Sequence, residues 1–293
     1  MTRIGIFLFE IFGKLMGKLP KKGIYVLSDF LFFIGFYVIR YRRKVVFENL
    51  KNAFPNKTKR EIKSISRRFF HHLSDVMIEN VASLYMNPDK IKKFVTIKNI
   101  EVLTDLYKKN KNITALIGHY GNWEFLTTVP PYTSYTILSV YKPLSNKFFD
   151  RKTYEMRERQ QAVPVPMKKV YKAIIEYEQM NQPYILGMVA DQSPPKREIN
   201  YWTTFLNQET AFFTGSEKIA KRFNHAVIFT AVHKVERGHY EVEFIKLFEN
   251  AKDAEAHEIT EKYARTLEQF IQKKPEYWLW SHRRWKHKRN SNN

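Results

Sequence analysis

From residue 58 onward, short apolar runs rich in β-branched and aromatic residues alternate with stretches of helical periodicity. The predicted strands are residues 94–97, 113–118, 135–140, 184–190, 226–233 and 240–245. The predicted helices are residues 59–86, a segment ending near Lys109, and residues 122–128, 146–160, 168–181, 214–224 and 256–273. Such alternation favours strands in one sheet with helices packed on its faces. We therefore expect an α/β fold with a central mixed, largely parallel sheet flanked by helices.

The first 57 residues have a different character and predict a separate N-terminal segment. Two apolar stretches, Ile4–Leu19 and Ile24–Ile39, are separated by a Pro-Lys-Lys-Gly turn. As a helix, each would reach about 24 Å, which is short of the roughly 30 Å hydrocarbon core of a bilayer. Asp29 within the second stretch also favours partial over full insertion.

Charge distinguishes a membrane anchor from an ordinary buried helix pair in this segment. Residues 1–60 carry thirteen Lys/Arg against three acidic residues, a net charge of +10, about half of the +21 of the whole chain. Basic residues beside apolar helices favour binding to an anionic membrane surface. We therefore expect residues 1–57 to be membrane-anchor helices and residues 58–293 to form the main domain. A buried helix pair is the alternative.

Composition excludes several kinds of chemistry. The chain has no cysteine, which excludes disulfides, thiolate nucleophiles and Cys-ligated metals. None of its histidines shows the spacing of a metal motif, so no metal site is expected. The net charge of +21 predicts a polyanionic partner: nucleic acid, an anionic membrane or an acidic protein. Nucleic acid binding is the alternative from another functional class, supported by 17 Tyr, 23 Phe and 5 Trp. It is not favoured, because no recognition motif is present and the basic residues concentrate beside apolar helices.

The segment most indicative of chemistry is residues 113–125, ITALIGHYGNWEF. His119 follows a predicted buried strand, at the strand end where open α/β sheets place their sites. Asn122 has the residue type of a helix N-cap, and Glu124 falls in the first turn of the next helix. This spacing suits a histidine base held by a carboxylate. Because no nucleophile accompanies the pair, we infer that the substrate supplies one, most simply a hydroxyl.

The His-Tyr-Gly-Asn-Trp-Glu segment resembles the His-x4-Asp/Glu signature of glycerolipid-type acyltransferases, in the form found in bacterial lipid A biosynthesis late acyltransferases (the lauroyl/myristoyl transferases). Further segments resemble that family in order along the chain: Tyr141–Pro143, Asn146, Asp150, Arg157 and Arg159, Ala190–Gln192, Phe205–Ala211 and His282–Trp285. The chain departs from the family pattern at Phe205–Asn207 and after Gln192.

The resemblance implies transfer of a fatty acyl chain from a thioester carrier to a hydroxyl of a lipid A-type glycolipid precursor. His119 would be the general base and Glu124 would orient it, with an oxyanion donor near Gly121 or at Arg157. The implied substrate-binding residues are Asn122, Lys142, Arg157, Arg159, Asp191 and Gln192. The block His282–Trp285 would bind headgroup phosphates or lie on the membrane surface.

The resemblance also implies partners and a location. The donor would be acyl carrier protein, which is acidic, or acyl-CoA, and no other cofactor is expected. The acceptor would be a membrane lipid, at the cytoplasmic face of the bacterial inner membrane. An acyltransferase for a lysophospholipid or an amino-acid lipid is the alternative within the same chemistry, since the same base and anchor would serve it.

Overall fold

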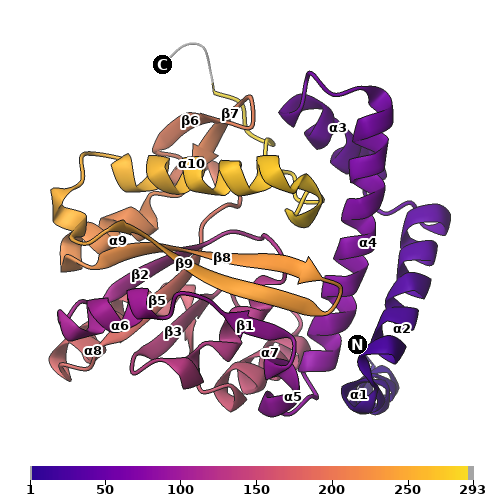
Figure 1. Ribbon diagram of the computed structural model, residues 1–293, viewed down its shortest axis with the longest axis horizontal. Helices are drawn as coiled ribbons and strands as arrows, with labels where there is room; N and C mark the ends of the chain where they lie inside the picture. Colours follow the sequence, from indigo (N-terminus) through magenta and orange to yellow (C-terminus); the bar gives the residue numbers. More distant parts are fainter. Residues whose placement is uncertain (1, 290–293) are drawn as a thin grey trace.

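The computed structural model describes residues 2–289 and contains, within them, a seven-stranded sheet with the order β1–β9–β8–β2–β5–β3–β4 (Figure 1). Its strands are β1 (Val95–Ile97), β2 (Ile113–Ile117), β3 (Thr136–Tyr141), β4 (Val163–Pro166), β5 (Tyr184–Val189), β8 (Ala226–Glu236) and β9 (His239–Phe248). Neighbouring strands are parallel except for the antiparallel pair β8–β9. The expected mixed, largely parallel sheet is therefore confirmed. Residue 1 and residues 290–293, the extreme ends of the two expected domains, lie outside the described residues.

Helices surround the sheet (Figure 1). The α-helices are α1 (Arg3–Lys18), α2 (Lys21–Phe33), α3 (Arg43–Ala53), α4 (Lys59–Ser83), α5 (Pro88–Lys92), α6 (Glu101–Lys108), α7 (Lys147–Arg159), α8 (Val170–Gln179), α9 (Gly215–Phe223) and α10 (Glu258–Lys273). A π-helix, η1 (Ile34–Val38), continues α2, and the short 3-10 helices include η2 (Trp123–Thr128) and η7 (Pro275–Tyr277). Thr58 caps α4 in a capping box with Glu61, which explains the sharp start of this long helix.

The central strands are buried on both faces, as the continuous apolar runs predicted. In β2, Leu116 packs into a cluster with α10, whereas Ile113 and Ala115 pack into a second cluster with α6. Helix α4 contributes to both clusters, through Ile62 and its neighbours at one end and Ala82 at the other. The alternation of side chains along β2 thus places helices on both faces of the sheet.

Three strands were not expected from the sequence, for identifiable reasons. Strand β4 reads Val-Pro-Val-Pro, and the structure places it at an edge of the sheet, where proline is tolerated. Strands β6 (Tyr201–Phe205) and β7 (Gln208–Phe212) form a hairpin outside the main sheet. Its two-residue turn has φ of 50° at Leu206 and 60° at Asn207. Two positive φ values favour Asn-Gly in such turns, so Leu-Asn gave no hairpin signal.

The N-terminal helices pack on the core through one face and leave the other exposed. Helix α2 lies beside α4 (Figure 1) and buries Ile24, Tyr25 and Ser28. The exposed apolar side chains of α1, α2, η1 and the turn after it are Ile4, Phe7, Leu8, Ile11, Phe12, Leu15, Val26, Phe30, Phe33, Tyr37, Val38, Ile39 and Tyr41. Within residues 2–289, no single helix is long and apolar enough to cross a membrane. The pair Lys21–Val38 and Arg43–Ala53, bent by 88°, meets the length and composition requirement together.

Asp29, the acidic residue within the second apolar stretch, is held by the core. The guanidinium of Arg237, after β8, donates to Asp29 Oδ1 at 2.6 Å and to Asp75 Oδ1 at 2.7 Å. Ser28 Oγ also donates to Asp75 Oδ1, at 2.6 Å. Asp75 lies on α4 and is fully buried. Polar contacts therefore fasten α2 to α4 and to the β8–β9 hairpin.

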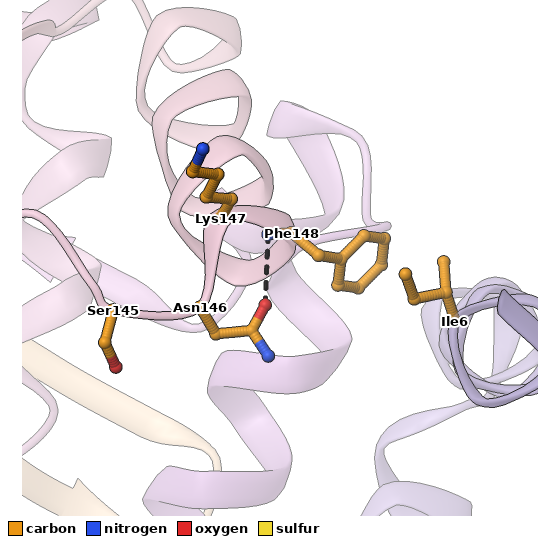
Figure 2. Close-up of a pocket in the computed structure, with 5 residues that line it drawn as sticks. All are labelled: Ile6, Ser145, Asn146, Lys147 and Phe148. Atoms are coloured by element: carbon orange, nitrogen blue, oxygen red, sulfur yellow. Dashed lines mark hydrogen bonds between the residues drawn. The ribbon is translucent and has the colours of Figure 1, made fainter. Parts of the chain in front are cut away.

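Helix α1 reaches the start of α7 on another side of the core. The ring of Phe9 contacts the ring of Phe149, with 5.0 Å between their centroids. Beside this contact, Ile6 and residues 145–148 line an open cavity of about 480 Å³ (Figure 2). Asn146 Oδ1 accepts from the backbone N–H of Phe148 at 3.0 Å and caps α7 (Figure 2).

Candidate active site

His119 lies two residues beyond β2, and Asp191 lies two residues beyond the neighbouring parallel strand β5. The register pairs Ile117 with Val189, so His119 and Asp191 follow their strands at the same level of the sheet. His119 Nδ1 donates to Asp191 Oδ1 at 2.6 Å, and the backbone N–H of His119 donates to Asp191 Oδ2 at 2.8 Å. Adjacent parallel strands thus bring together a base and a carboxylate that are 72 residues apart in the chain.

Asp191 is almost completely buried and has a third donor. The indole Nε1–H of Trp278 donates to Asp191 Oδ2 at 2.7 Å. Burial disfavours the carboxylate, but the charge of His119 and these hydrogen bonds outweigh it, so the pKa of Asp191 lies below its ordinary value. Asp191 is therefore ionised and fixed in orientation.

The pKa of His119 is raised above its ordinary value. Burial opposes the imidazolium, but the charge and hydrogen bond of Asp191, together with the charge of Glu124, outweigh that effect. The side chain of His119 is 15% exposed, and the ring of Trp123 lies edge-on to it with 4.7 Å between centroids. The imidazole is a partly accessible base whose cationic form is stabilised by its surroundings.

The second imidazole nitrogen faces Gln192. His119 Nε2 and Gln192 Nε2 are 3.0 Å apart. With the Nδ1 proton donated to Asp191, the neutral ring presents a lone pair at Nε2, and the amide N–H of Gln192 donates to it. The atom that would accept a substrate proton is therefore identified, and Gln192 occupies that position.

Glu124 does not take the position that the sequence spacing predicted for it. Its carboxylate is bound by Arg157, whose Nη2 lies 3.3 Å from Glu124 Oε1 and 3.1 Å from Oε2. Asp191 forms the hydrogen bond to Nδ1 that was expected from Glu124. This corrects the expected orienting role: Glu124 acts on His119 only through its charge, and directly on Arg157. The local segment is a 3-10 helix rather than the start of an α-helix.

The C-terminal segment after α10 fixes the loop that carries His119. Residues 277–279 run beside residues 119–121: the N–H of Leu279 donates to the carbonyl of His119 at 3.1 Å, and the N–H of Gly121 donates to the carbonyl of Tyr277 at 3.0 Å. The Gly121 amide itself is therefore occupied. An oxyanion donor near Gly121, or at Arg157, stays a prediction.

Glycine is required at position 121 for two reasons. Its φ is +65°, a left-handed conformation. A Cβ there would also lie 2.1 Å from the carbonyl oxygen of Val232 in β8. The turn after His119 thus depends on a close approach between two backbones.

Asn122 points into the core. It is fully buried, and its Nδ2 donates to Glu79 Oε2 at 2.8 Å instead of capping the following helix. Glu79 also accepts from the hydroxyls of Tyr25 at 2.6 Å and Tyr240 at 2.8 Å. Asn122 therefore anchors the loop that carries His119 to α4, α2 and β9, and this buried position corrects the expected substrate contact.

Two other expected substrate-binding residues lie apart from this cluster of contacts. Arg159 Nη2 donates to the carbonyls of Ser83 at 3.3 Å and Leu84 at 2.7 Å, so it closes the C-terminal end of α4. Lys142 is exposed, and no hydrogen bond joins it to another residue within the described part of the chain. The substrate role of Lys142 stays a prediction, whereas the contacts of Arg159 are structural.

Within the terminal block His282–Trp285, Arg283 is exposed, so a contact of its side chain with headgroup phosphates or a membrane surface stays a prediction, whereas Arg284 and Trp285 pack against the protein. Arg284 is 2% exposed, donates to the carbonyl of Ala211 at 2.6 Å and lies over the ring of Phe212. Trp285 Nε1 donates to Thr210 Oγ1 at 2.7 Å. These two side chains pack against β7, and each donates one hydrogen bond to it.

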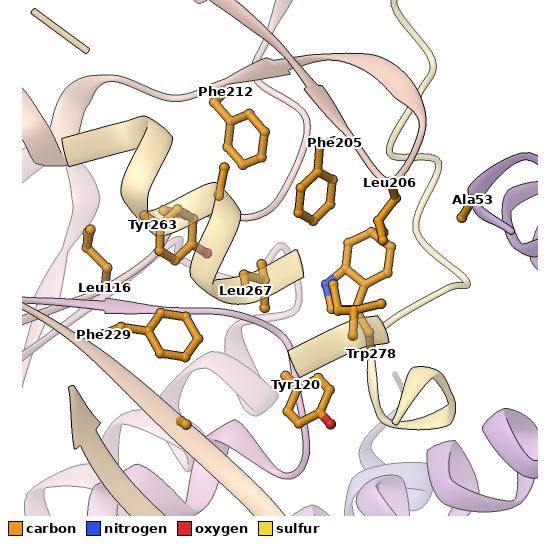
Figure 3. Close-up of a cluster of buried hydrophobic side chains, with 14 of the residues drawn as sticks. Ala53, Leu116, Tyr120, Phe205, Leu206, Phe212, Phe229, Tyr263, Leu267 and Trp278 are labelled. Atoms are coloured by element: carbon orange, nitrogen blue, oxygen red, sulfur yellow. The ribbon is translucent and has the colours of Figure 1, made fainter. Parts of the chain in front are cut away.

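Aromatic residues of the β6–β7 hairpin belong to the core. Phe205 and Phe212 are fully buried and gather with Tyr263, Leu267 and Trp278 (Figure 3). This cluster holds the indole of Trp278 beside Asp191. Sequence reasoning did not identify Trp278 as a site residue, because a tryptophan carries no signal of which carboxylate it will meet.

Comparison with known protein families identifies a match over nearly the whole chain. A family model described as bacterial lipid A biosynthesis acyltransferase matches residues 1–287. A search of curated proteins finds no match to the chain.

Proposed function

The chain belongs to the bacterial lipid A biosynthesis acyltransferase family, and on this premise we propose that it transfers a fatty acyl chain from an acyl thioester to a hydroxyl of a lipid A-type glycolipid precursor. The observation that carries the proposal is the His119–Asp191 pair at the carboxyl ends of β2 and β5. It provides a base without a nucleophile of its own, which matches direct attack by a substrate hydroxyl.

In the proposed reaction, the acceptor hydroxyl replaces the amide of Gln192 at His119 Nε2. The imidazole takes the hydroxyl proton while the oxygen attacks the thioester carbonyl, forming a tetrahedral oxyanion. Collapse of this intermediate breaks the carbon–sulfur bond, and the imidazolium returns the proton to the leaving thiolate. General-base assistance of this kind contributes about 10² to 10⁴-fold to the rate.

Asp191 and Glu124 have different parts in this scheme. Asp191 fixes the Nδ1–H tautomer and stabilises the imidazolium, as the aspartate does in serine-protease triads. Glu124 holds Arg157, whose guanidinium is the proposed donor to the oxyanion. The side-chain amide of Gln192 donates to His119 Nε2 until the acceptor hydroxyl takes its place.

We propose that the thioester is carried by acyl carrier protein. That partner is acidic, and the net charge of +21 on this chain favours the encounter. The reaction needs no metal or other cofactor, because the thioester already carries the activated acyl group.

We further propose that the exposed apolar face of α1, α2 and η1 lies in the cytoplasmic leaflet of the bacterial inner membrane. Arg40, Arg42, Arg43 and Lys44 follow η1 directly and would meet anionic headgroups. This arrangement would deliver a lipid acceptor to an enzyme whose N-terminal helices are fastened to its catalytic core.

The test is acyl transfer by the purified protein in detergent. Acyl carrier protein or CoA loaded with a fatty acid would be the donor, and a lipid A-type precursor or a lysophospholipid would be the acceptor, with products identified by mass spectrometry. We expect acylated glycolipid from the wild-type protein and none from a folded His119→Ala variant. Acylation of the lysophospholipid alone would contradict the proposal that the acceptor is a glycolipid. Equal amounts of product from His119→Ala and the wild-type protein would contradict the role of His119 as general base.

A further inference from the structure

A second hollow, distinct from the site at His119, lies between α2, α4, β8 and η7. It has a volume of about 380 Å³, and its lining residues are Phe32, Ser64, Arg67, Arg68, His71, His72, Lys234, Glu276 and Tyr277. None of these residues takes part in the proposed acyl transfer.

The cationic side chains of this hollow retain unused hydrogen-bond donors. Arg67 is exposed and has no ion pair or hydrogen bond to any residue between 2 and 289. Arg68 donates to Ser64 Oγ at 2.8 Å and to Glu276 Oε1 at 3.2 Å, which leaves part of its guanidinium free. Lys234 Nζ uses one donor on Asp75, at 2.8 Å. Converging Arg and Lys donors of this kind suit a phosphate group.

The same hollow is also lined by a neutral imidazole, that of His72, and by one carboxylate, that of Glu276. His72 is 4% exposed, and its Nε2–H donates to the carbonyl of Gly121 at 3.3 Å. Its Nδ1 therefore carries a lone pair, and that atom is buried without a partner. Burial and the charge of Lys234 lower the pKa of His72 to about 3, so the ring stays neutral. Because His72 Nδ1 has almost no accessible surface, the acceptor that a ligand in the hollow can reach is the Glu276 carboxylate, which binds Arg68 through Oε1 and can accept from a hydroxyl of the ligand.

The position of the hollow indicates where such a ligand would come from. Phe32 on its lining stacks on Phe36 of η1, with 5.4 Å between centroids. Phe33, Tyr37 and Val38 beside them are exposed and belong to the apolar face assigned to the membrane. The hollow therefore adjoins the surface that would lie among lipid headgroups.

We propose that this hollow binds the headgroup of an anionic phospholipid whose phosphodiester bears free hydroxyls, as in phosphatidylglycerol. Arg67, Arg68 and Lys234 hold the phosphate, and the Glu276 carboxylate accepts from a glycerol hydroxyl. Because His72 donates to Gly121 in the catalytic loop, an occupied hollow lies directly behind the turn that carries His119. The lipid source rests on the proposed membrane placement, whereas recognition of the headgroup does not.

The experiment compares two charge reversals on α4 in the full-length protein. Arg67→Glu changes the hollow, and Arg60→Glu is the matched control, because Arg60 is also exposed on α4 but does not line the hollow. Binding of sn-glycerol 3-phosphate and of inorganic phosphate is measured by calorimetry in detergent. Binding to phosphatidylcholine vesicles with and without phosphatidylglycerol is measured by sedimentation, and melting temperatures confirm folding.

We expect sn-glycerol 3-phosphate to bind more tightly than inorganic phosphate. Arg67→Glu should weaken its binding about tenfold, Arg60→Glu should leave it unchanged, and only Arg67→Glu should lower the preference for phosphatidylglycerol vesicles. Equal effects of the two variants would contradict the assignment of the hollow as the binding site. Equal affinity for the two soluble probes would contradict recognition of the ligand through its hydroxyls. If Arg67→Glu kept the wild-type preference for phosphatidylglycerol vesicles, the ligand would not be a membrane phospholipid. The soluble-probe measurements need neither a membrane nor acyl transfer, so their failure is distinct from failure of the proposed function.

Discussion

Replacing Asp191 by Asn tests which carboxylate orients the base. The Oδ2 position of Asp191 accepts two N–H donors, from the His119 backbone at 2.8 Å and from Trp278 at 2.7 Å. An Asn side chain would place its only oxygen there and turn its NH₂ group toward Nδ1. Nδ1 would then have to accept, so Nε2 would carry the proton and could not take one from the acceptor hydroxyl. In a serine protease, the same wrong tautomer lowers kcat about 10⁴-fold. We expect Asp191→Asn to lower the rate of acyl transfer by a similar factor.

Glu124→Gln is the matched comparison. It removes the same charge at a carboxylate that contacts Arg157 and not the imidazole. Loss of an Arg–carboxylate hydrogen bond costs about 1.5–3 kcal/mol. We therefore expect Glu124→Gln to lower the rate of acyl transfer about ten- to a hundredfold.

The pH dependence gives a second measurement of the same mechanism. A general base acts when neutral, so wild-type activity should rise as pH increases through the raised pKa of His119. Removing the Asp191 charge lowers that pKa, and the residual activity of Asp191→Asn should reach its plateau at a lower pH. Initial rates from mass spectrometry of the acylated product, with melting temperature as the folding control, would measure both effects. Near-normal turnover in Asp191→Asn together with inactive Glu124→Gln would refute this assignment.

Three further predictions concern two residues that support the site and the exposed N-terminal face. Gly121→Ala should abolish activity and lower the melting temperature, because the new Cβ would meet the carbonyl of Val232 at 2.1 Å; unchanged melting and turnover would contradict this. Burial raises the pKa of Glu79, so the stability of the wild-type protein should fall as pH rises above about 4.5. In Glu79→Gln, the melting temperature should depend less steeply on pH, and identical pH dependence in the two proteins would contradict this prediction. Phe7→Glu should weaken vesicle binding, whereas Val235→Glu, at a similarly exposed apolar side chain, should not; equal flotation of the two variants would argue against the N-terminal face.

The sequence by itself determined six of the seven strands of the sheet and the position of His119. Apolar runs such as Ile113–Ile117 have a local pattern that burial on both faces requires, so their strand character is visible without the fold. His119 follows such a run, and its place at a strand end was predictable for the same reason.

Only the tertiary structure decided which groups meet His119. The parallel pairing of β2 with β5 sets Asp191 level with the imidazole, and the chain returns after α10 to add Trp278. Glu124 is closer in sequence, yet a guanidinium from α7 binds it. Register between distant strands and the packing of a terminal segment are long-range properties, because they are fixed by the burial of whole elements and not by the spacing of residues within one motif.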